Sequence, residues 1–293
     1  MTRRLLSEYA ELGLDSLTDG FRRLGIKQRQ TVLVHSSLRA FGQVAGGAEA
    51  VVQALLTVLG PRGTVVVPTQ TAYNRDPSRL KPPPPPDVIP WIWRRGMPAF
   101  DPGATPSRRM GRIAECVRTW PDARRSTHPQ TSFAAVGPLA EYILDPHELP
   151  HQLDDRSPLG RLEEVGARIL LLGVGFARCT AFHLAEYRLP DPEFRLNYCA
   201  VRTPAGREWQ TYIGRVLNQE DFDRLGNSLV AETGLVATQK VGDACCHLVS
   251  LPDAVEYAEK WFRMNRTLPS LGPPETEIRP AEPRYPSRAA ARR

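Results

Sequence analysis

Two β-branched runs separated by an amphipathic helix are the feature that most limits the fold of this chain. Residues 31–35 are Thr-Val-Leu-Val-His, and residues 63–68 are Gly-Thr-Val-Val-Val-Pro. Between them, apolar residues recur at helical spacing at Val51, Val52, Leu55, Leu56 and Leu59. Continuous apolar runs of this length are typical of strands buried on both faces. Strand, helix and strand in this order predict parallel pairing with a right-handed crossover.

The same alternation continues along the chain. Further strands are expected at residues 132–136 and 169–172, and further helices at residues 17–24, 111–120, 138–144, 221–232, 244–251 and 252–262, with Ser157 and Pro158 starting another. A hairpin of residues 198–203 and 208–213 is expected to edge the sheet. The order predicts a single α/β/α domain over residues 1–268, built on a central mainly parallel or mixed sheet. Residues 269–293, rich in Pro and Arg, are expected to form a frayed tail.

The segment 69–106 differs from the rest of the chain. It contains five consecutive prolines at residues 82–86, followed by Trp91 and Trp93. Proline fixes φ and lacks a backbone N–H, so the segment fits neither an interior helix nor an interior strand. We therefore expect a long Pro/Trp-rich loop that packs as a lid or wall of a site.

Charge and cysteine content narrow the class of protein. The net charge of +6 owes much to arginines near the C-terminus, and no basic stripe interleaved with aromatics appears, which disfavours nucleic-acid binding. The five cysteines are odd in number and lack Cys-x-x-Cys spacing, so we expect reduced thiols and no metal site. No segment has the length and apolarity of a membrane span. The expectation is a soluble cytoplasmic protein without a membrane partner.

The strongest candidate for a reaction centre follows the apolar run 169–172. That run ends at Gly-Val-Gly, and Thr180 is expected to cap a short helix carrying His183 and Glu186 on one face. The carboxyl end of a buried strand is where open α/β sheets bind ligands. An imidazole beside a carboxylate is suited to general-base chemistry. The same spacing also fits a buried histidine with a purely structural role.

Three other clusters have both a functional and a structural interpretation. Residues 34–38, Val-His-Ser-Ser-Leu, can hold an anion on backbone N–H groups or can simply form a strand-end turn. Residues 124–129 can contact phosphates through arginine or can form a turn. The acids Glu220, Asp221 and Asp223 open a predicted helix, where the helix dipole alone favours them.

Taken together, these stretches resemble the aminoglycoside 3-N-acetyltransferase family. The matching stretches are Val-His-Ser-Ser-Leu at 34–38, Gly-Thr-Val-Val-Val-Pro-Thr at 63–69, Met-Pro-Ala-Phe-Asp-Pro at 97–102, Arg-Ser-Thr-His-Pro at 125–129, Ser-Pro-Leu-Gly-Arg-Leu at 157–162, Leu-Leu-Leu-Gly-Val-Gly at 170–175 and Thr-Ala-Phe-His-Leu-Ala-Glu at 180–186. Each is weak alone, but their common order over residues 31–190 is specific. The proline run at 82–86 is not part of this pattern.

The resemblance implies acetyl transfer from acetyl-CoA, without a metal, to the 3-amino group of a 2-deoxystreptamine aminoglycoside. Transferred by position, the CoA-binding residues are His35, Ser36, Ser37, Leu38, Met110, Arg125 and Ser126. His183 is the expected base, with Glu186 or Glu220 as its acidic partner. Tyr73, Asp76, Asp221 and Asp223 are the expected contacts to the aminoglycoside. Backbone N–H groups or hydroxyls near Ser126 or Thr180 are expected to stabilise the oxyanion.

Direct transfer is expected, without an acetyl intermediate on Cys179, and a homodimer is one assembly compatible with this interpretation. Two alternatives stay open from the sequence. The first is an acetyl-CoA-dependent transferase for another amine in a biosynthetic pathway. The second is a catalytically silent CoA-binding protein.

Overall fold

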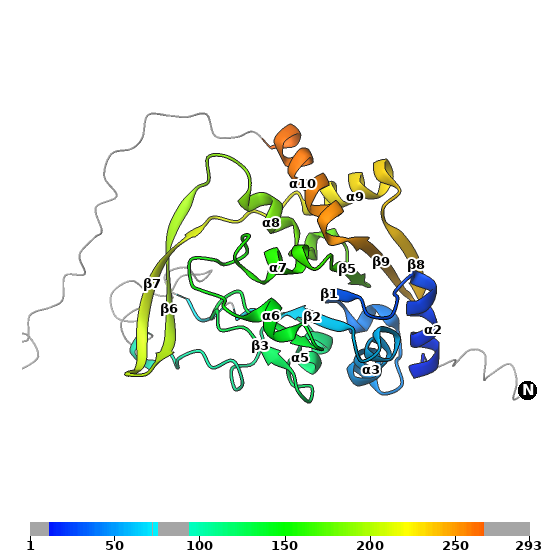
Figure 1. Cartoon of the computed structure of the whole chain (residues 1–293), viewed down its shortest axis with the longest axis horizontal. Coiled ribbons are helices and arrows are strands. Elements are labelled where there is room, and N and C mark those ends of the chain that lie inside the picture. The colour runs from blue at the N-terminus through cyan, green and yellow to red at the C-terminus, as the bar shows by residue number, and fades with distance from the viewer. Residues whose placement is uncertain (1–11, 72, 76–93, 267–293) are drawn as a thin grey trace, which may run out of the picture.

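The computed structural model describes residues 12–71, 73–75 and 94–266 (Figure 1). Its strands are β1 (Thr31–Ser36), β2 (Thr64–Pro68), β3 (Arg124–Arg125), β4 (Phe133–Val136), β5 (Arg168–Leu172), β6 (Phe194–Thr203), β7 (Gly206–Arg215), β8 (Ala237–Val241) and β9 (Ala244–Ser250). Its α-helices are α2 (Leu14–Leu24), α3 (Gly47–Leu59), α5 (Arg112–Arg118), α6 (Ala140–Leu144), α7 (Pro158–Glu164), α8 (Phe182–Tyr187), α9 (Phe222–Thr233) and α10 (Leu251–Asn265). Two short 3₁₀ turns, η1 (Leu38–Phe41) and η3 (Phe176–Arg178), complete the described elements.

Within these residues the central sheet has seven strands in the order β3-β4-β2-β1-β5-β9-β8. The strands β2, β1 and β5 pair in parallel at its centre, and the flanking strands pair antiparallel. The predicted strand–helix–strand unit is therefore confirmed, and so is the mixed sheet. Parallel strands at the centre place the ends of β1 and β5 side by side, with Ser36 opposite Leu172.

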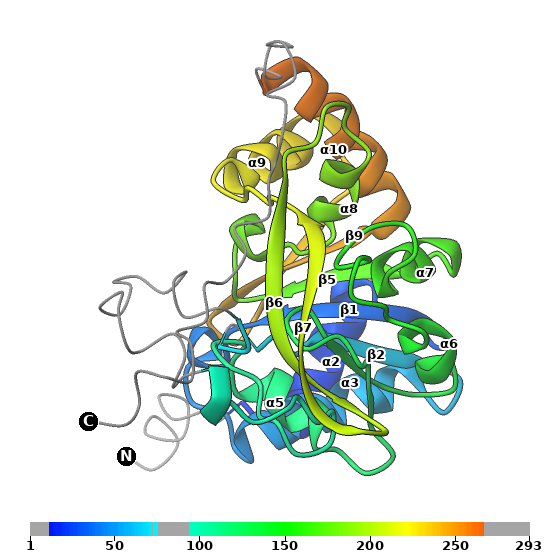
Figure 2. The ribbon, with the colours of Figure 1, turned by 90° about the vertical axis from the view of Figure 1, so that its left-hand side faces the viewer.

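Alternating side chains of the three parallel strands supply two separate cores. Val32, Val34, Leu170 and Leu172 face α2, α3 and α5, whereas Leu33, Ile169 and Leu171 face α6 to α10. Each of these strand residues is almost completely buried. Because both faces of the sheet are covered by helices, the strands can be apolar throughout, and the molecule has the expected three α/β/α layers (Figures 1 and 2).

Local sequence determines where several elements begin and end. The α2 helix ends at Gly25, whose φ of 105° lets its N–H bond back to the carbonyls of Arg22 and Phe21. The α7 helix begins as predicted, with the Ser157 side chain accepting a hydrogen bond from the N–H of Leu159 and with Pro158 in the first turn. After β5, Gly173 turns with φ of 65°, and a Cβ there would lie 2.3 Å from the Cβ of Ala40. The turn after β5 therefore requires glycine.

The predicted hairpin exists, but its position differs from the expectation. The strands β6 and β7 form a separate two-stranded sheet, so the prediction that this hairpin edges the central sheet is wrong. The backbone of Ala200 on β6 bonds to the Asn74 side chain through both its N–H and its carbonyl, and the same carbonyl accepts from the N–H of Phe100. The edge of β6 is thus occupied by loop segments, and the hairpin stands apart from the sheet at one side of the molecule (Figure 1).

The prediction of a helix over residues 244–251 is also wrong. These residues form β9, which pairs antiparallel with β5 and continues through β8 to the edge of the sheet. Ala244, Cys246 and Leu248 alternate into one core while Val249 faces the other, a period-two pattern. Residues 244–250 form a strand because the backbone N–H and C=O groups along the edge of β5 need hydrogen-bond partners, and a paired strand supplies them.

The remaining expectations concern segments that are partly or wholly undescribed. The proline run at residues 82–86, Trp91, Trp93 and the predicted domain boundary at residues 268/269 lie outside the described residues. Within the described ranges, no helix is both long and apolar enough to cross a membrane.

Candidate active site

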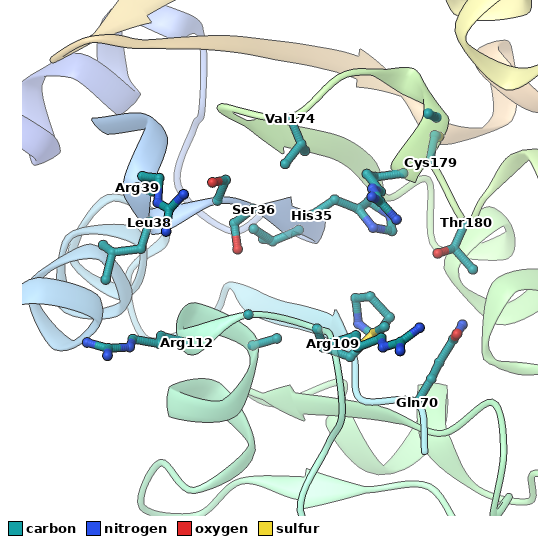
Figure 3. Close-up of a pocket in the computed structure, with 18 of the residues that line it drawn as sticks. His35, Ser36, Leu38, Arg39, Gln70, Arg109, Arg112, Val174, Cys179 and Thr180 are labelled. Atoms are coloured by element: carbon teal, nitrogen blue, oxygen red, sulfur yellow. The ribbon is translucent and has the colours of Figure 1, made fainter. Parts of the chain in front are cut away.

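A cavity of about 940 Å³ lies where the carboxyl end of β1 meets the turn after β5 (Figure 3). Its lining comes from four parts of the chain: residues 34–39 and 42; residues 68, 70, 109–112 and 114; residues 174, 177–180 and 183; and residues 219 and 222. Figure 3 shows Leu38 and Arg39 toward one end of the cavity and Thr180 toward the other. The position agrees with the rule that open α/β sheets bind ligands beyond the carboxyl ends of their strands.

The side chain of His183 forms part of the cavity wall. It projects from α8, and only 8% of the residue is exposed. The helix begins at Phe182 with Ala181 in the capping position and has no side-chain cap, so the prediction that Thr180 caps it is wrong. Thr180 instead lines the cavity beside His183. The ring of Phe222 lies 4.8 Å from the ring of His183 and limits its movement.

Behind His183, Glu186 is buried and fully hydrogen-bonded. Its Oε2 atom lies 2.7 Å from Nδ1 of His183, while its Oε1 atom accepts from Nη1 of Arg266 at 2.7 Å and from the N–H of Asn218 at 2.9 Å. Burial raises the pKa of Glu186, but the hydrogen bond from His183 and the other contacts outweigh burial, so the pKa is lowered overall. An ionised Glu186 accepts the Nδ1 proton, which leaves the Nε2 lone pair of His183 free to take a proton.

Arg266 connects Glu186 to Asp221. Its guanidinium donates to both carboxylate oxygens of Asp221, at 2.7 and 2.8 Å, and to the carbonyl of Asn218 at 2.7 Å. The same group lies 3.9 Å from the centre of the Phe262 ring. Through Arg266, Asp221 is therefore engaged in holding the His183–Glu186 pair rather than free for a ligand.

His35 lines the same cavity, near enough to His183 for the two rings to interact electrostatically. It follows Val34 at the end of β1, only 5% of the residue is exposed, and its Nε2 atom is buried without a hydrogen-bond partner. Burial, together with the nearby His183, lowers the pKa of His35 to about 3. The imidazole of His35 is therefore neutral at physiological pH.

Arginines supply the charge around the cavity. The exposed residues Arg39, Arg109, Arg112 and Arg178 line it, and none of them forms an ion pair within the described part of the chain. The described lining contains no carboxylate. The cavity is therefore suited to a ligand with several negative charges, such as a molecule with phosphate groups.

Five of the predicted cofactor residues, namely His35, Ser36, Ser37, Leu38 and Met110, line the cavity. Arg125 and Ser126 do not. The Arg125 guanidinium bonds to the carbonyls of Thr69 and Thr105, and the Ser126 hydroxyl accepts from the N–H of Phe133 at 2.9 Å and contacts Nδ1 of His147 at 2.9 Å. Both side chains thus hold loops together near the site.

The other predicted residues are more dispersed. Glu220 is exposed and outside the lining, and Oδ1 of Asp223 accepts from the N–H of Ala177 at 2.7 Å. Tyr73 is 46% exposed, with the Arg108 guanidinium over its ring, and Asp76 lies outside the described residues. The choice between the two candidate partners of His183 therefore falls on Glu186. No group of three or more metal-ligating side chains occurs among the residues that are described.

Sequence reasoning missed several residues of the site. Gln70, Gln219 and the four arginines of the cavity carry no local motif, and Arg266 is 80 positions from Glu186. The only available signal for Arg266 was its place four residues beyond the predicted helix 252–262, near a helix end where cations are favoured.

A mixed α/β sheet covered by helices on both faces, with a buried His–Glu pair in the wall of a cationic cavity, is typical of an enzyme that binds an anionic cosubstrate. The chain belongs to the aminoglycoside 3-N-acetyltransferase family, whose model, described as "Aminoglycoside 3-N-acetyltransferase", matches residues 33–263. The SPbeta prophage-derived aminoglycoside N(3')-acetyltransferase-like protein YokD of Bacillus subtilis (strain 168) is 41% identical over 251 residues, which cover 85% of this chain and 92% of that protein.

Solved structures agree with this membership. The crystal structure of YokD from Bacillus subtilis superposes with a TM-score of 0.85 at 41% identity, over 87% of this chain and 94% of that chain. A structure described as AAC-IIIb binary with CoASH gives a TM-score of 0.78 at 26% identity, over 88% and 99% of the two chains. One described as AAC-VIa bound to sisomicin gives 0.78 at 28% identity, over 87% and 98%. The predicted family and fold class are thus confirmed.

Proposed function

We propose that this protein transfers the acetyl group of acetyl-CoA to the 3-amino group of a 2-deoxystreptamine aminoglycoside, which would inactivate the antibiotic. The observation that carries the proposal is the hydrogen-bonded His183–Glu186 pair, at 2.7 Å, in the wall of the large cationic cavity. Family membership supports the reaction as a whole. The CoASH-bound relative supports the donor, and the sisomicin-bound relative supports the acceptor.

The donor half of the proposal rests on charge and shape. The pyrophosphate and the 3′-phosphate of CoA need cations and hydroxyls, which Arg39, Arg112, Ser36 and Ser37 supply around the cavity. Leu38 and Arg39 lie toward the end of the cavity opposite Thr180 (Figure 3). Phosphates bound at that end leave the pantetheine arm to run toward His183 and the acetyl group to lie beside it.

The acceptor half rests on the base. An ammonium group must lose a proton before its nitrogen attacks a thioester, and a positioned base contributes ~10²–10⁴-fold to such a step. In the proposed reaction the ammonium group first loses one proton to solvent. Nε2 of His183 then takes a second proton from the nitrogen as the new C–N bond forms at the acetyl carbon, and the C–S bond breaks. The CoA thiolate then receives the proton from His183. Glu186 stabilises the imidazolium that exists between these two transfers.

Release of free thiol from acetyl-CoA with a panel of aminoglycosides tests the proposal, with NMR of the product to locate the acetyl group. The chain is expected to turn over 2-deoxystreptamine drugs and to acetylate the 3-amino position. His183→Ala should abolish turnover while calorimetry shows CoA affinity nearly unchanged. Retained turnover in that variant would remove His183 as the base.

A second candidate keeps the donor and changes the acceptor. The described lining of the cavity contains no carboxylate, although a polycationic drug is favoured by acidic surroundings. An amine with fewer positive charges, as in a biosynthetic acyl transfer, fits such a lining as well. Turnover in the same assay with simple amines but with no aminoglycoside would establish this second function.

A further inference from the structure

Within the part of the chain that the structure describes, His35 is the one lining residue with a buried side-chain polar atom that has no hydrogen-bond partner. Of the buried side-chain atoms without a partner in the described structure, which are on His35, Arg75, Arg118, Arg168 and Trp209, only that of His35 belongs to a residue of the cavity. Burying a polar atom without a partner costs free energy, and such an atom in a native fold calls for an explanation. Because His35 lines the cavity, a bound substrate can supply the missing hydrogen-bond partner of its Nε2 atom.

The surroundings of His35 assign it a role different from that of His183. The two imidazoles are close enough for the charge of one to oppose protonation of the other, and burial holds His35 neutral with a pKa lowered to about 3. Glu186 lies against His183 and stabilises its imidazolium, whereas no described carboxylate hydrogen-bonds to His35. His183 is therefore the ring that accepts the proton, and His35 is the ring that stays neutral.

A neutral imidazole keeps one N–H donor without a net charge. Figure 3 shows the His35 side chain reaching from the end of β1 toward Cys179 and Thr180, the part of the chain that leads into the helix of His183. A thioester placed beside His183 therefore also lies beside His35. As the amine attacks, negative charge develops on the thioester oxygen, and a fixed donor in a buried site stabilises that charge strongly.

We propose that His35 is a catalytic residue that donates a hydrogen bond to the thioester carbonyl oxygen of acetyl-CoA during attack by the amine. The inference rests on the proposed acetyl transfer and adds to it the group that stabilises the oxyanion. The nitrogen–carbon bond forms, the oxygen gains negative charge and returns it when the C–S bond breaks, and His35 neither gains nor loses a proton. The role is distinct from holding the CoA phosphates.

Two variants at this position separate catalysis from packing. His35→Phe keeps an aromatic ring without a polar atom, and His35→Gln keeps an N–H donor. With the aminoglycoside that the wild type turns over, His35→Phe should lower kcat by ~10²–10³-fold, the usual loss for one oxyanion donor, and His35→Gln should lose less. The Kd for CoA should stay near that of the wild type in both variants. Because His35→Phe removes a buried unpartnered atom, its melting temperature should be unchanged or higher.

Several results would overturn the proposal. Wild-type kcat in His35→Phe would do so, and so would a loss of CoA affinity that accounts for the whole loss of kcat/KM. A lower melting temperature with equal losses in both variants would assign His35 to packing. Thr180→Val removes the lining hydroxyl that is nearest in sequence to His183, and a loss confined to that variant would assign the oxyanion to Thr180. A wild-type chain without turnover would contradict the proposed function, whereas an active His35→Phe contradicts only the role of His35.

Discussion

Nδ1 of His183 lies 2.7 Å from Oε2 of Glu186, and the two side chains are only 10% and 4% exposed. A buried carboxylate in this position fixes the tautomer of the ring and stabilises its protonated form. Glu186→Gln preserves the shape but removes the charge, so we expect kcat to fall by ~10²–10⁴-fold with little change in the Kd for CoA. Steady-state kinetics and calorimetry on the same preparation measure both quantities.

Glu220 provides the comparison for this experiment. It was the second carboxylate predicted from the sequence, but it is exposed and outside the cavity lining. Glu220→Gln makes the same chemical change without touching His183, and we expect kcat to stay close to that of the wild type. If Glu220→Gln loses activity and Glu186→Gln keeps it, the assignment of Glu186 as the partner of His183 is wrong.

Arg266 should support both stability and activity. Its side chain is 16% exposed, and its guanidinium bridges Glu186 and Asp221. Removal of one member of a buried ionic network leaves uncompensated charges, so Arg266→Ala should lower the free energy of unfolding by about 3 kcal/mol. It should also lower kcat, because Glu186 loses one of the contacts that orient it. Urea unfolding and the acetylation assay test the two effects separately.

Arg263 gives a matched control for that substitution. It lies one turn earlier in α10, is exposed and forms no ion pair within the described residues. Arg263→Ala removes the same charge and should leave stability and kcat nearly unchanged. Equal losses in the two variants would mean that net charge, and not the bridge to Glu186, causes the effect.

The arginines of the cavity should act on cofactor binding. Arg39 and Arg112 line the cavity and are exposed, so their guanidinium groups are available to phosphates. A hydrogen bond between an arginine and a phosphate contributes ~1.5–3 kcal/mol, so Arg39→Ala or Arg112→Ala should raise the KM for acetyl-CoA about tenfold or more. The effect should shrink at high salt, since salt screens exposed charges. Arg23→Ala on α2, outside the cavity, should leave KM unchanged, and an equal effect there would refute a local role.

The features predicted correctly from the sequence are those that depend on local pattern. The strands β1, β2 and β5 carry continuous apolar runs, which only burial on both faces explains. His183 and Glu186 are three residues apart in one helix, so their contact follows from helix geometry alone. The strand ends, the turn at Gly173 and the cap at Ser157 are likewise local.

The features that were missed depend on partners distant in the sequence. The segment of β9 fits a helix as well as a strand, and only the unpaired edge of β5 selects the strand. The contact between Arg266 and Glu186 spans 80 positions, and nothing near either residue indicates it. Arginine is a common phosphate ligand, but in this fold the guanidinium of Arg125 donates to the loop carbonyls of Thr69 and Thr105. Residue types alone do not show which hydrogen-bond donors are already bonded to other groups of the protein.

Besides His35, two further buried histidines make stability depend on pH. The rings of His128 and His147 are tilted by 38° with their centres 4.8 Å apart, and His128 accepts hydrogen bonds at Nδ1 from the N–H groups of Gln130 and Thr131. Burial lowers the pKa of His128 to about 4 and lowers the pKa of His147 well below its usual value. The folded state therefore favours both rings neutral, whereas the unfolded chain protonates them near pH 6.5.

The sign of the effect follows from proton uptake. Between about pH 6.5 and 4 the unfolded state binds more protons than the folded state, so the free energy of unfolding falls as pH falls, by up to about 1.4 kcal/mol per pH unit for each histidine. The stabilisation is complete above pH 6.5. His128→Gln should be less stable at pH 8 and should show a shallower decline, as measured by urea unfolding from pH 8 to pH 4.5. A decline as steep as that of the wild type would show that His128 does not contribute to acid sensitivity.

Cys179 lines the cavity next to Thr180 and is the thiol closest in sequence to His183, so it is the residue on which an acetyl intermediate would form if transfer were not direct. Burial raises the pKa of the Cys179 thiol to about 12, and the side chain is completely buried. A thiol is a weak nucleophile until it is deprotonated, so this residue is unsuited to attack a thioester. Cys179→Ser should therefore keep a kcat close to that of the wild type, and mass spectrometry of the wild-type enzyme mixed with acetyl-CoA alone should show no acetylated protein. Accumulation of an acetyl group on Cys179, together with loss of turnover in Cys179→Ser, would replace direct transfer with a two-step reaction.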